Sequence, residues 1–330
     1  MERKFDVYGI GNAIVDLQLR IAEEDLTNLG LEKAAMKLVE TADQAKLLQY
    51  FSGRELNHAS GGSAANTMIG IAQLGGTVGY GCLVGDDTFG RFYLDEMRRL
   101  GVSLRTSPVS GKETGSSVIL ITPDAERTMN THLGVSADFN EKNVSEIDLA
   151  ESSWLYIEGY LFSSPGGQKA VQRAIELARE YDVKVAITFS DGFIVDFFGE
   201  HLRNAVDQAD LIFANLNESQ RFTKCDDEVA VFSKLKEVVP ACVMTLSERG
   251  ALVYYEGKEA RIDPFNVTAV DDTGAGDMFA GAFLFGITHG LDAAAAGRLA
   301  CFLSSRVVSQ LGPRLKSDGR QLARDAGLLE

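Results

Sequence analysis

The sequence predicts an α/β protein with a mostly parallel central sheet, and three observations support this. From residue 150 onwards, short apolar runs alternate with helical segments of about 10 to 15 residues, which is typical of βαβ units. The 330 residues include 33 glycines, 6 prolines and 45% hydrophobic residues, which suits a sizeable core with many tight turns. Two β-like regions, about 15–40 and 112–133, fall outside this rhythm. We expect them to be insertions that form a small sheet over one single domain, 1–330.

Hydrophobic periodicity and turn residues give the individual elements. Residues 17–40 mix alternating and short apolar runs, a poor helix pattern, and are expected to form short strands. The expected strands elsewhere cover 5–10, 78–84, 117–122, 127–133, 154–157, 183–188, 211–214, 242–246 and 251–255. The expected helices cover 41–51, a segment ending at 74, 89–100, 168–181, 198–208, 228–238, 278–289 and 293–310.

Charge and composition argue against several classes of partner. The chain has 32 Lys and Arg against 47 Asp and Glu, a formal charge of −15, which disfavours binding to nucleic acid or anionic membranes. The four cysteines are widely spaced and the four histidines lack metal-ligand spacing, so neither a disulfide framework nor a zinc site is expected. The beginning of the chain lacks the apolar run of a signal peptide, and no run of 18 apolar residues occurs, so a cytoplasmic protein is expected.

The run Asp272-Thr273-Gly274-Ala275-Gly276-Asp277 carries the strongest chemical signal. It leads from an extended segment into a helix of small and apolar residues, and helix N-termini bind anions through their unpaired N–H groups and dipole. Gly274 and Gly276 would allow a phosphate to approach the backbone closely. Asp277 would then lie beside the anion, where it can accept a proton from an attacking hydroxyl. A plain helix cap needs one aspartate and no paired glycines, so it explains the run less well.

This run resembles the C-terminal signature of the PfkB carbohydrate kinase family, whose fold is a ribokinase-like three-layer α/β/α sandwich with a small β-sheet lid. The resemblance implies that the amides of Gly274, Ala275 and Gly276 form an anion hole for the transferred phosphoryl group. It implies that Asp277 is the catalytic base. Phosphoryl transfer depends mainly on positioning and charge stabilisation, so the physical argument and the resemblance agree.

Two segments near the N-terminus match the acceptor side of the same family. Gly61-Gly62-Ser63-Ala64-Ala65-Asn66 resembles its N-terminal Gly-Gly-x-x-x-Asn signature, and Gly11-Asn12-Ala13-Ile14-Val15-Asp16 resembles the segment whose Asp grips two sugar hydroxyls. Alone, each also fits a tightly packed turn before a helix or strand. The resemblance implies substrate contacts from Asn12, Asp16, Gly62, Ser63 and Asn66.

Three later segments match the nucleotide side, which implies ATP and Mg²⁺ as cofactors. Asn215-Leu216-Asn217-Glu218 resembles the family's Asn-x-x-Glu, which organises Mg²⁺ and its waters through Asn215 and Glu218. Thr245-Leu246-Ser247-Glu248-Arg249-Gly250 resembles a nucleotide loop, with Ser247 where Gly is more usual. Residues 308–312, which include Ser309, resemble the segment that closes over the adenine. The family also implies a monovalent cation, K⁺, near Asp271, Thr273 and Gly312.

The acceptor is expected to be a nucleoside or a sugar. The runs Gly9-Ile10-Gly11-Asn12 and Ile157-Glu158-Gly159-Tyr160-Leu161, together with residues 189–194, are more similar to adenosine kinases than to ribokinases. Tyr160 would stack on a purine, or else simply pack at a strand end. We therefore expect phosphorylation of the 5′-hydroxyl of adenosine or a related purine nucleoside. A sugar kinase acting on ribose or fructose is the alternative.

Other functions fit the sequence less well. A dinucleotide-binding dehydrogenase needs a third glycine where Ile14 stands, and no Walker A exists because Glu113 follows Gly111-Lys112. A non-catalytic nucleoside- or sugar-binding regulator on the same fold would not need the intact Asp277 and its glycines. The small sheet must cover the substrate or pair with another copy, so the protein is expected to be a monomer or a homodimer through this lid.

Overall fold

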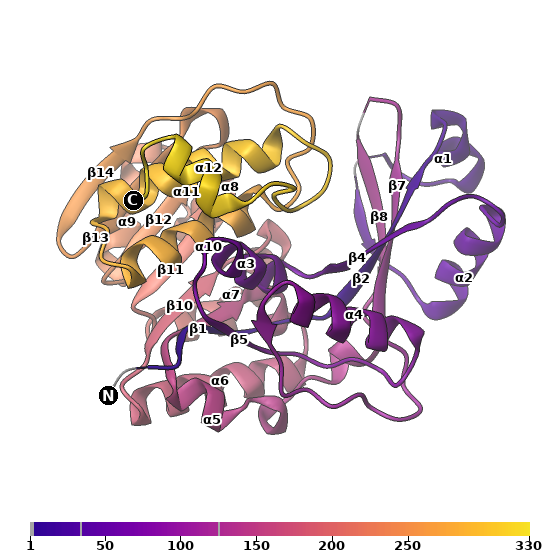
Figure 1. Ribbon diagram of the computed structural model, residues 1–330, viewed down its shortest axis with the longest axis horizontal. Helices are drawn as coiled ribbons and strands as arrows, with labels where there is room; N and C mark the ends of the chain where they lie inside the picture. Colours follow the sequence, from indigo (N-terminus) through magenta and orange to yellow (C-terminus); the bar gives the residue numbers. More distant parts are fainter. Residues whose placement is uncertain (1–2, 34, 125) are drawn as a thin grey trace.

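The computed structural model describes residues 3–33, 35–124 and 126–330. Ala34 and Ala125, inside the two expected insertions, lie outside the described residues. The described chain forms a large lobe around a long twisted sheet and a smaller lobe around a second sheet, which stands at one side of it in Figure 1.

The large sheet has nine strands among the described residues, in the order β14-β13-β12-β11-β10-β9-β1-β5-β6. Neighbouring strands from β12 to β6 in this order pair in parallel. The pairs β12–β13 and β13–β14 are antiparallel and form one edge of the sheet. The strands are β1 (Phe5–Ile10), β5 (Val78–Gly81), β6 (Val102–Ser103), β9 (Ser152–Glu158), β10 (Lys184–Thr188), β11 (Leu211–Asn215), β12 (Cys242–Thr245), β13 (Ala251–Tyr255) and β14 (Lys258–Ile262).

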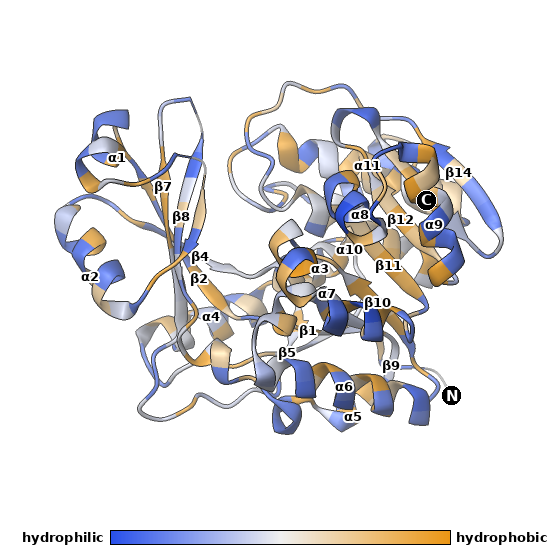
Figure 2. Cartoon of the chain, turned by 180° about the vertical axis from the view of Figure 1, so that it is seen from behind, coloured by the Kyte–Doolittle hydropathy of each residue, from blue (hydrophilic) through white to orange (hydrophobic). Residues whose placement is uncertain are grey.

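Helices cover both faces of this sheet. Alternate strand residues such as Val7 and Tyr156 belong to one core, whereas Tyr8 and Ile157 belong to another, as the two-residue period of strands requires. In Figure 2 the strands between the layers are largely apolar and the outer helix faces are polar. The first core holds α3 (Ser63–Gln73), α4 (Thr88–Arg99), α10 (Ala275–Thr288), α11 (Ala293–Val308) and α12 (Gly319–Asp325). The second holds α5 (Glu146–Ala150), α6 (Pro165–Glu180), α7 (Gly192–Val206), α8 (Leu216–Thr223) and α9 (Glu228–Val238). The predicted three-layer α/β/α sandwich is confirmed.

The small sheet has five strands among the described residues, in the order β3-β8-β7-β2-β4. Its outer face is covered by α1 (Glu23–Leu29) and α2 (Thr41–Tyr50), away from the large lobe (Figure 1). The strands are β2 (Ile14–Arg20), β3 (Met36–Leu38), β4 (Asn57–Gly61), β7 (Gly115–Ile121) and β8 (Arg127–His132).

The expectation of short strands throughout 17–40 is wrong for α1. Three acidic residues, 23–25, occupy its first turn, where their charges interact favourably with the positive end of the helix dipole and stabilise the helix. Asp25 also accepts a hydrogen bond from the Ala22 amide at 3.0 Å. Gly30 ends the helix in a left-handed conformation with φ 63°. Capping therefore makes up for a weak apolar pattern that favoured no helix.

Other elements differ more modestly from expectation. Helix α7 begins at Gly192 rather than 198, because Asp191 caps its N-terminus, and Phe198 marks a kink inside it. Strand β4 has the weak strand sequence NHASG and pairs with β2 through its backbone. Hydrophobic periodicity missed β4, β14, α5, α8 and α12.

Two of the chain crossings between the lobes pass the same place. β1 continues through Gly11 into β2, and β4 continues through Gly61 and Gly62 into α3. An added Cβ at Gly62 would lie 2.3 Å from the Asn12 carbonyl oxygen, so the two crossings touch and leave no room for a side chain. The segments that carry the predicted substrate residues are thus held together at the junction of the lobes.

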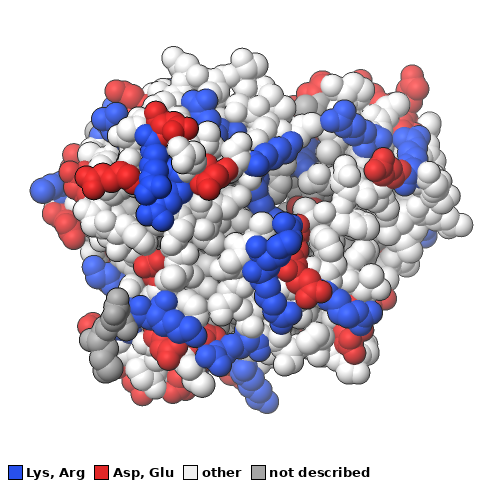
Figure 3. Space-filling model, in the orientation of Figure 1, with Lys and Arg blue, Asp and Glu red and all other residues white. Residues whose placement is uncertain are grey.

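The surface mixes both signs of charge. On the face drawn in Figure 3, Lys and Arg side chains lie among Asp and Glu side chains. Within the described ranges, none of the helices has both the length and the apolar character needed to cross a membrane.

Candidate active site

Asp277 lies where the N-termini of two helices meet. It occupies the first turn of α10, and its carboxylate accepts hydrogen bonds from the Ser63 hydroxyl at 2.6 Å and the Asn66 amide at 3.0 Å, both from α3. Desolvation raises the pKa of Asp277 to about 6, and the two hydrogen bonds and the charge of Arg314 oppose that rise. A carboxylate of this kind is ionised at neutral pH and can still accept a proton.

The glycines before Asp277 play different structural parts. Gly274 has φ 75°, and an added Cβ would lie 2.3 Å from the Pro313 carbonyl oxygen, so the turn accepts no other residue without shifting. An added Cβ at Gly276 meets nothing within 4 Å. The Ala275 amide donates to the Asp272 carbonyl at 3.1 Å, which occupies one of the three amides predicted to hold an anion. The helix start is therefore open to a ligand on the Gly276 side.

Asp16 brings a second carboxylate to the same place. It lies on β2, and its side chain is on the opposite face of the strand from the core residues Val15 and Leu17. Its carboxylate packs against the backbone of Gly61, within 2.8 Å of where a Cβ would be. Burial raises the pKa of Asp16 to about 6, and Arg314 and Arg127 oppose this. The structure thus brings together Asp16, Ser63, Asn66 and Asp277, as the sequence predicts.

Glu158 connects the two substrate segments, and sequence reasoning did not assign it a role. It ends β9, and its carboxylate accepts from the Asn12 side-chain amide at 2.9 Å, the Asn12 backbone amide at 3.3 Å and the Ala64 backbone amide at 2.9 Å. Burial raises the pKa of Glu158 to about 7, against these hydrogen bonds. Gly11 fits beside it because an added Cβ would lie 2.4 Å from the carboxylate.

Tyr160 follows Glu158 in the short helix η3 (Gly159–Ser163). Its hydroxyl donates to Asp191 at 3.4 Å. Burial raises the pKa of Tyr160, and the charges of Asp191, Glu158, Asp277 and Glu218 add to this rise. The Tyr160 side chain is thus close to Asp191 and to the charges of Glu158, Asp277 and Glu218.

Asn215 and Glu218 form the next part of the site. Asn215 ends β11 and caps α8: its side-chain oxygen accepts from the Glu218 amide at 2.8 Å, while the Glu218 carboxylate accepts from the Asn215 backbone and side-chain amides at 2.9 and 2.8 Å. Burial raises the pKa of Glu218 to about 7. A surface pocket of about 460 Å³ adjoins this pair and has Phe193 and Phe197 among its lining residues.

This donor set fits a hydrated Mg²⁺ carried by a nucleotide better than a dedicated metal cage. Among the residues that the structure describes, no cluster of three or more His, Cys, Asp or Glu could hold a metal ion. Mg²⁺ usually keeps several waters and binds through one or two carboxylates plus phosphate oxygens. Glu218 would supply one such carboxylate, with its orientation fixed by Asn215.

Of the remaining predicted nucleotide residues, Thr245, Ser247 and Gly250 lie at or just after the end of the neighbouring strand β12, and Ser309 lies at the end of α11. Thr245 is paired with Asn215 across β12 and β11. Ser247 begins a 3₁₀ turn with φ 54°, and Gly250 has φ 85° with no space for a Cβ beside the Ile262 carbonyl. Ser309 caps the end of α11, where its hydroxyl donates to the Arg306 carbonyl at 2.9 Å.

The carboxylate of Asp271, one of the residues predicted to hold a monovalent cation, is already hydrogen-bonded to other groups in this arrangement. One oxygen of Asp271 accepts from Arg127 at 2.9 Å and from the Gly312 amide at 2.7 Å, and the other accepts from the Thr273 amide at 3.0 Å. The Asp271 carboxylate thus already neutralises the Arg127 guanidinium, in an ion pair that is almost wholly buried. This pair joins the small sheet to the segment before Gly274.

Comparison with known proteins identifies the family of this chain. The model of the pfkB family carbohydrate kinases matches residues 34–318, which is most of the chain. The chain belongs to the pfkB family of carbohydrate kinases. The predicted resemblance and fold are confirmed, and the protein is a phosphotransferase that acts on an alcohol group.

Three relatives, one named a probable sugar kinase and two named adenosine kinases, show where the kinase stands in the family. A crystal structure of a probable sugar kinase from Rhizobium etli CFN 42 has a TM-score of 0.92 and 33% identity, covering 99% of this chain and 100% of that chain. A crystal structure of adenosine kinase from Sinorhizobium meliloti has a TM-score of 0.90 and 34% identity, covering 98% and 99%. The adenosine kinase of Saccharomyces cerevisiae is 27% identical over 331 residues, covering 94% of this chain and 96% of its own.

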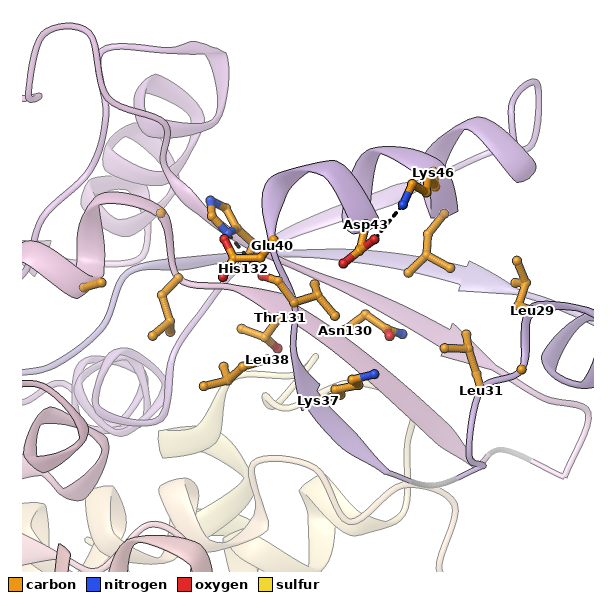
Figure 4. Close-up of a pocket in the computed structure, with 16 residues that line it drawn as sticks. Leu29, Leu31, Lys37, Leu38, Glu40, Asp43, Lys46, Asn130, Thr131 and His132 are labelled. Atoms are coloured by element: carbon orange, nitrogen blue, oxygen red, sulfur yellow. Dashed lines mark hydrogen bonds and ion pairs between the residues drawn. The ribbon is translucent and has the colours of Figure 1, made fainter. Parts of the chain in front are cut away.

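A separate pocket of about 700 Å³ lies beside the small sheet of the kinase (Figure 4). It is lined by β3 residues such as Leu38, by β8 residues such as Thr131, and by Asp43 and Lys46 of α2, which form an ion pair at 2.8 Å. None of the residues predicted for the active site lines it. The size of this pocket therefore says nothing about where the kinase reaction takes place.

Three charged residues around the site of the kinase were not predicted from its sequence. Glu158 has the strongest sequence signal of the three, because it ends an apolar parallel strand, and open α/β sheets bind ligands at this edge. Arg127 merely begins an extended run, and Arg314 follows Gly312-Pro313 in a segment without periodicity. Their positions depend on how distant segments fold together.

Proposed function

We propose that this kinase transfers the γ-phosphate of ATP to the 5′-hydroxyl of adenosine or a closely related purine nucleoside, giving AMP and ADP. The observation that carries the proposal is the Asp277 carboxylate, held by Ser63 and Asn66 beside the open side of Gly276. A nucleophile and an anion can meet at this point, since a base and a helix N-terminus lie side by side.

In the proposed reaction, Asp277 accepts the proton of the acceptor hydroxyl as its oxygen forms a bond to the γ-phosphorus. The bond from that phosphorus to the bridging oxygen breaks, and ADP leaves with its electron pair. The first-turn amides of α10 stabilise the charge on the transferred group. Glu218 and Asn215 would hold Mg²⁺ through its waters, and the ion would supply charge neutralisation at the phosphates. Thr245, Ser247, Gly250 and Ser309 are assigned to the nucleotide.

The acceptor is assigned to the opposite side. Asp16 and Asn12 bind the ribose hydroxyls, Gly62 and Ser63 let the sugar approach the helix start, and Tyr160 stacks on the base. The raised pKa values of Asp16 and Asp277 fit a site that becomes fully dry when the acceptor binds. The similarity to two adenosine kinases at full length supports the nucleoside.

A sugar acceptor is the second candidate. It is favoured by the probable sugar kinase of Rhizobium etli, which matches the whole chain at a TM-score of 0.92. A hydroxymethyl group bound by Asp16 and Asn66 satisfies the same base, so the difference lies in what contacts Tyr160.

The test is ADP release with MgATP across a panel of nucleosides and sugars that includes adenosine, inosine, ribose and fructose. We expect adenosine to give the highest kcat/KM. Turnover of ribose or fructose without turnover of adenosine would replace the nucleoside with the sugar assignment.

A second measurement tests the base with the same panel. Asp277→Asn should lower kcat by roughly 10²–10⁴-fold while adenosine binding stays detectable by calorimetry. Asp207→Asn, an exposed aspartate at the end of α7, is the matched control and should behave like the wild type. Near wild-type turnover by Asp277→Asn would reject the base assignment.

A further inference from the structure

Arg314 places a largely buried guanidinium directly behind the proposed acceptor site. It lies in the segment between α11 and α12, and its side chain is 13% exposed. Its Nε donates to the Asn66 side-chain oxygen at 3.0 Å, and one terminal nitrogen lies 4.0 Å from the Glu96 carboxylate. The other terminal nitrogen is buried and has no hydrogen-bond partner among the described residues. A buried arginine with incomplete pairing is costly, so its position needs an explanation.

The contact with Asn66 fixes which way that side-chain amide points. A guanidinium can only donate, so it must face the oxygen of the amide. The nitrogen of Asn66 therefore points the other way and donates to Asp277 at 3.0 Å. Without Arg314, the amide could turn and present its oxygen to the Asp277 carboxylate, which would repel it.

The charge of Arg314 also favours the ionised form of Asp277. Desolvation raises the pKa of Asp277, and Arg314 lowers it together with the hydrogen bonds from Ser63 and Asn66. It also lowers the pKa of Asp16. The titratable and charged groups around Asp277 are Asp16 on β2, Tyr156 and Glu158 on β9, Tyr160 on η3 and Arg314, while Arg127 on β8 and Glu96 on α4 flank Asp16.

We propose that Arg314 is a positioning residue, which orients the Asn66 amide and supplies the positive charge that keeps Asp277 ionised and hydrogen-bonded as a base. This proposal rests on the proposed function, in which Asp277 accepts the proton of the acceptor hydroxyl. Arg314 acts through Asn66 and through its charge, and it needs no contact with the acceptor or the nucleotide.

The test is the pH dependence of kcat for the full-length enzyme, with MgATP and the acceptor that gives the highest turnover in the panel. The wild type should lose activity as the pH falls through about 6, where Asp277 becomes protonated. Arg314→Met removes the charge and keeps much of the volume. Its acid limb should move upward by about one pH unit, with a loss of about fivefold at pH 6 and partial recovery at pH 9.

Two further variants separate charge from geometry. Arg314→Lys keeps a charge but lacks the planar Nε–H group that faces Asn66, so kcat should fall severalfold at all pH values without a shift of the acid limb. Arg203→Met is the control for losing the packing and hydrogen bond of an arginine elsewhere, because Arg203 packs on the Phe222 ring and donates to the Phe222 carbonyl at 2.8 Å. This control should lower the melting temperature and leave the acid limb in place.

The outcomes distinguish the two proposals. If Asp277→Asn abolishes turnover but Arg314→Met has the acid limb of the wild type, the positioning role is rejected and the proposed function stands. If Asp277→Asn stays active, both fall. Should Arg314→Met not fold, Arg314→Lys decides alone: a shifted acid limb, or wild-type kcat at every pH, would overturn the proposal.

Discussion

The two sides of the proposed active site, one assigned to the acceptor and the other to the nucleotide, are built differently. On the acceptor side, Asp16 and Glu158 are buried and Asp277 is hydrogen-bonded by two side chains. On the nucleotide side, Asn215, Ser247 and Ser309 are exposed, and Glu218 is the buried carboxylate. The acceptor side is thus fixed before any ligand binds, at the cost of desolvating three carboxylates. Buried carboxylates of this kind are found where a site is pre-organised for chemistry. We infer that this site invests more free energy in holding the acceptor than in holding the nucleotide.

The largest effect is expected at the turn where the two sides meet. Gly274→Ala would force a Cβ into a left-handed residue against the Pro313 carbonyl, so we expect a loss of both stability and activity, the latter by at least about 100-fold. Gly276→Ala meets no protein atom, so it should melt like the wild type. Its added methyl group would occupy the proposed phosphate position and should also lower kcat by about 100-fold. Melting temperature and kcat are measured for both.

The control for these glycines is Gly199→Ala in α7, where an added Cβ also meets nothing within 4 Å. It should keep full activity and gain slightly in stability, because alanine restricts the unfolded chain. Full activity in Gly276→Ala would show that the open space beside this residue is not the phosphate site.

The second prediction compares the two buried glutamates, which have the same pKa of about 7 and both accept from backbone amides. In Glu158→Gln, the new amide must face a donor on Asn12 or Ala64, so the two substrate segments should separate. We expect KM for the acceptor to rise by about 10- to 100-fold with KM for ATP little changed. Glu218→Gln should do the reverse. Initial rates with each substrate varied in turn give both constants.

Matched effects would contradict the division of the site into two sides. If both variants raised the same KM, Glu158 and Glu218 would belong to one binding surface. Glu176→Gln, at an exposed position in α6, controls for the change of charge and should alter neither constant.

The third prediction treats the two sides as alike, because stability depends on charge burial and not on ligands. The pKa values of Glu158 and Glu218 rise on folding from 4.5 to about 7. Between these pH values the folded state binds more protons than the unfolded state, so the free energy of unfolding falls as the pH rises. We expect the ligand-free enzyme to melt at a higher temperature at pH 5.5 than at pH 7.5. Each glutamate contributes on the order of 2 kcal/mol.

Replacing either glutamate by glutamine should flatten this slope, whereas Glu176→Gln should leave it unchanged. The carboxyl groups with lowered pKa values, such as Asp87 and Asp124, titrate below this window and cannot produce the effect. A melting temperature that rises steadily from pH 5.5 to 7.5 would exclude it.

Sequence reasoning found the parts of this molecule that local rules determine. The parallel sheet follows from its apolar runs, and the convergence of Asp16, Asn66 and Asp277 follows from motifs with known spacing. It missed α1 and β4, whose formation depends on capping and on pairing with β2. It also missed Arg314 and Glu158, because these charges reach the site only when segments distant in the sequence fold together. Glu158, for example, contacts Ala64, which is 94 positions away in the sequence.

The smallest effect is expected at Ser247 on the nucleotide side. Its φ of 54° lies in the left-handed region, which costs an L-residue about 1 kcal/mol or more, and glycine avoids that cost while losing part of the gain to chain entropy. Ser247→Gly should therefore raise the melting temperature by about 1–2 °C. Glu256→Gly, at φ 53° in the turn between β13 and β14, should give a similar gain away from the site.

The KM for ATP then shows what the serine contributes. If the loop binds the nucleotide through its backbone, Ser247→Gly leaves KM within about twofold of the wild type, and the strain is simply the consequence of having a serine at a glycine position. A severalfold rise in KM in Ser247→Gly, with no change in Glu256→Gly, would show that the hydroxyl itself contacts the nucleotide. The nucleotide side would then resemble the acceptor side in keeping a residue that costs stability because it serves binding.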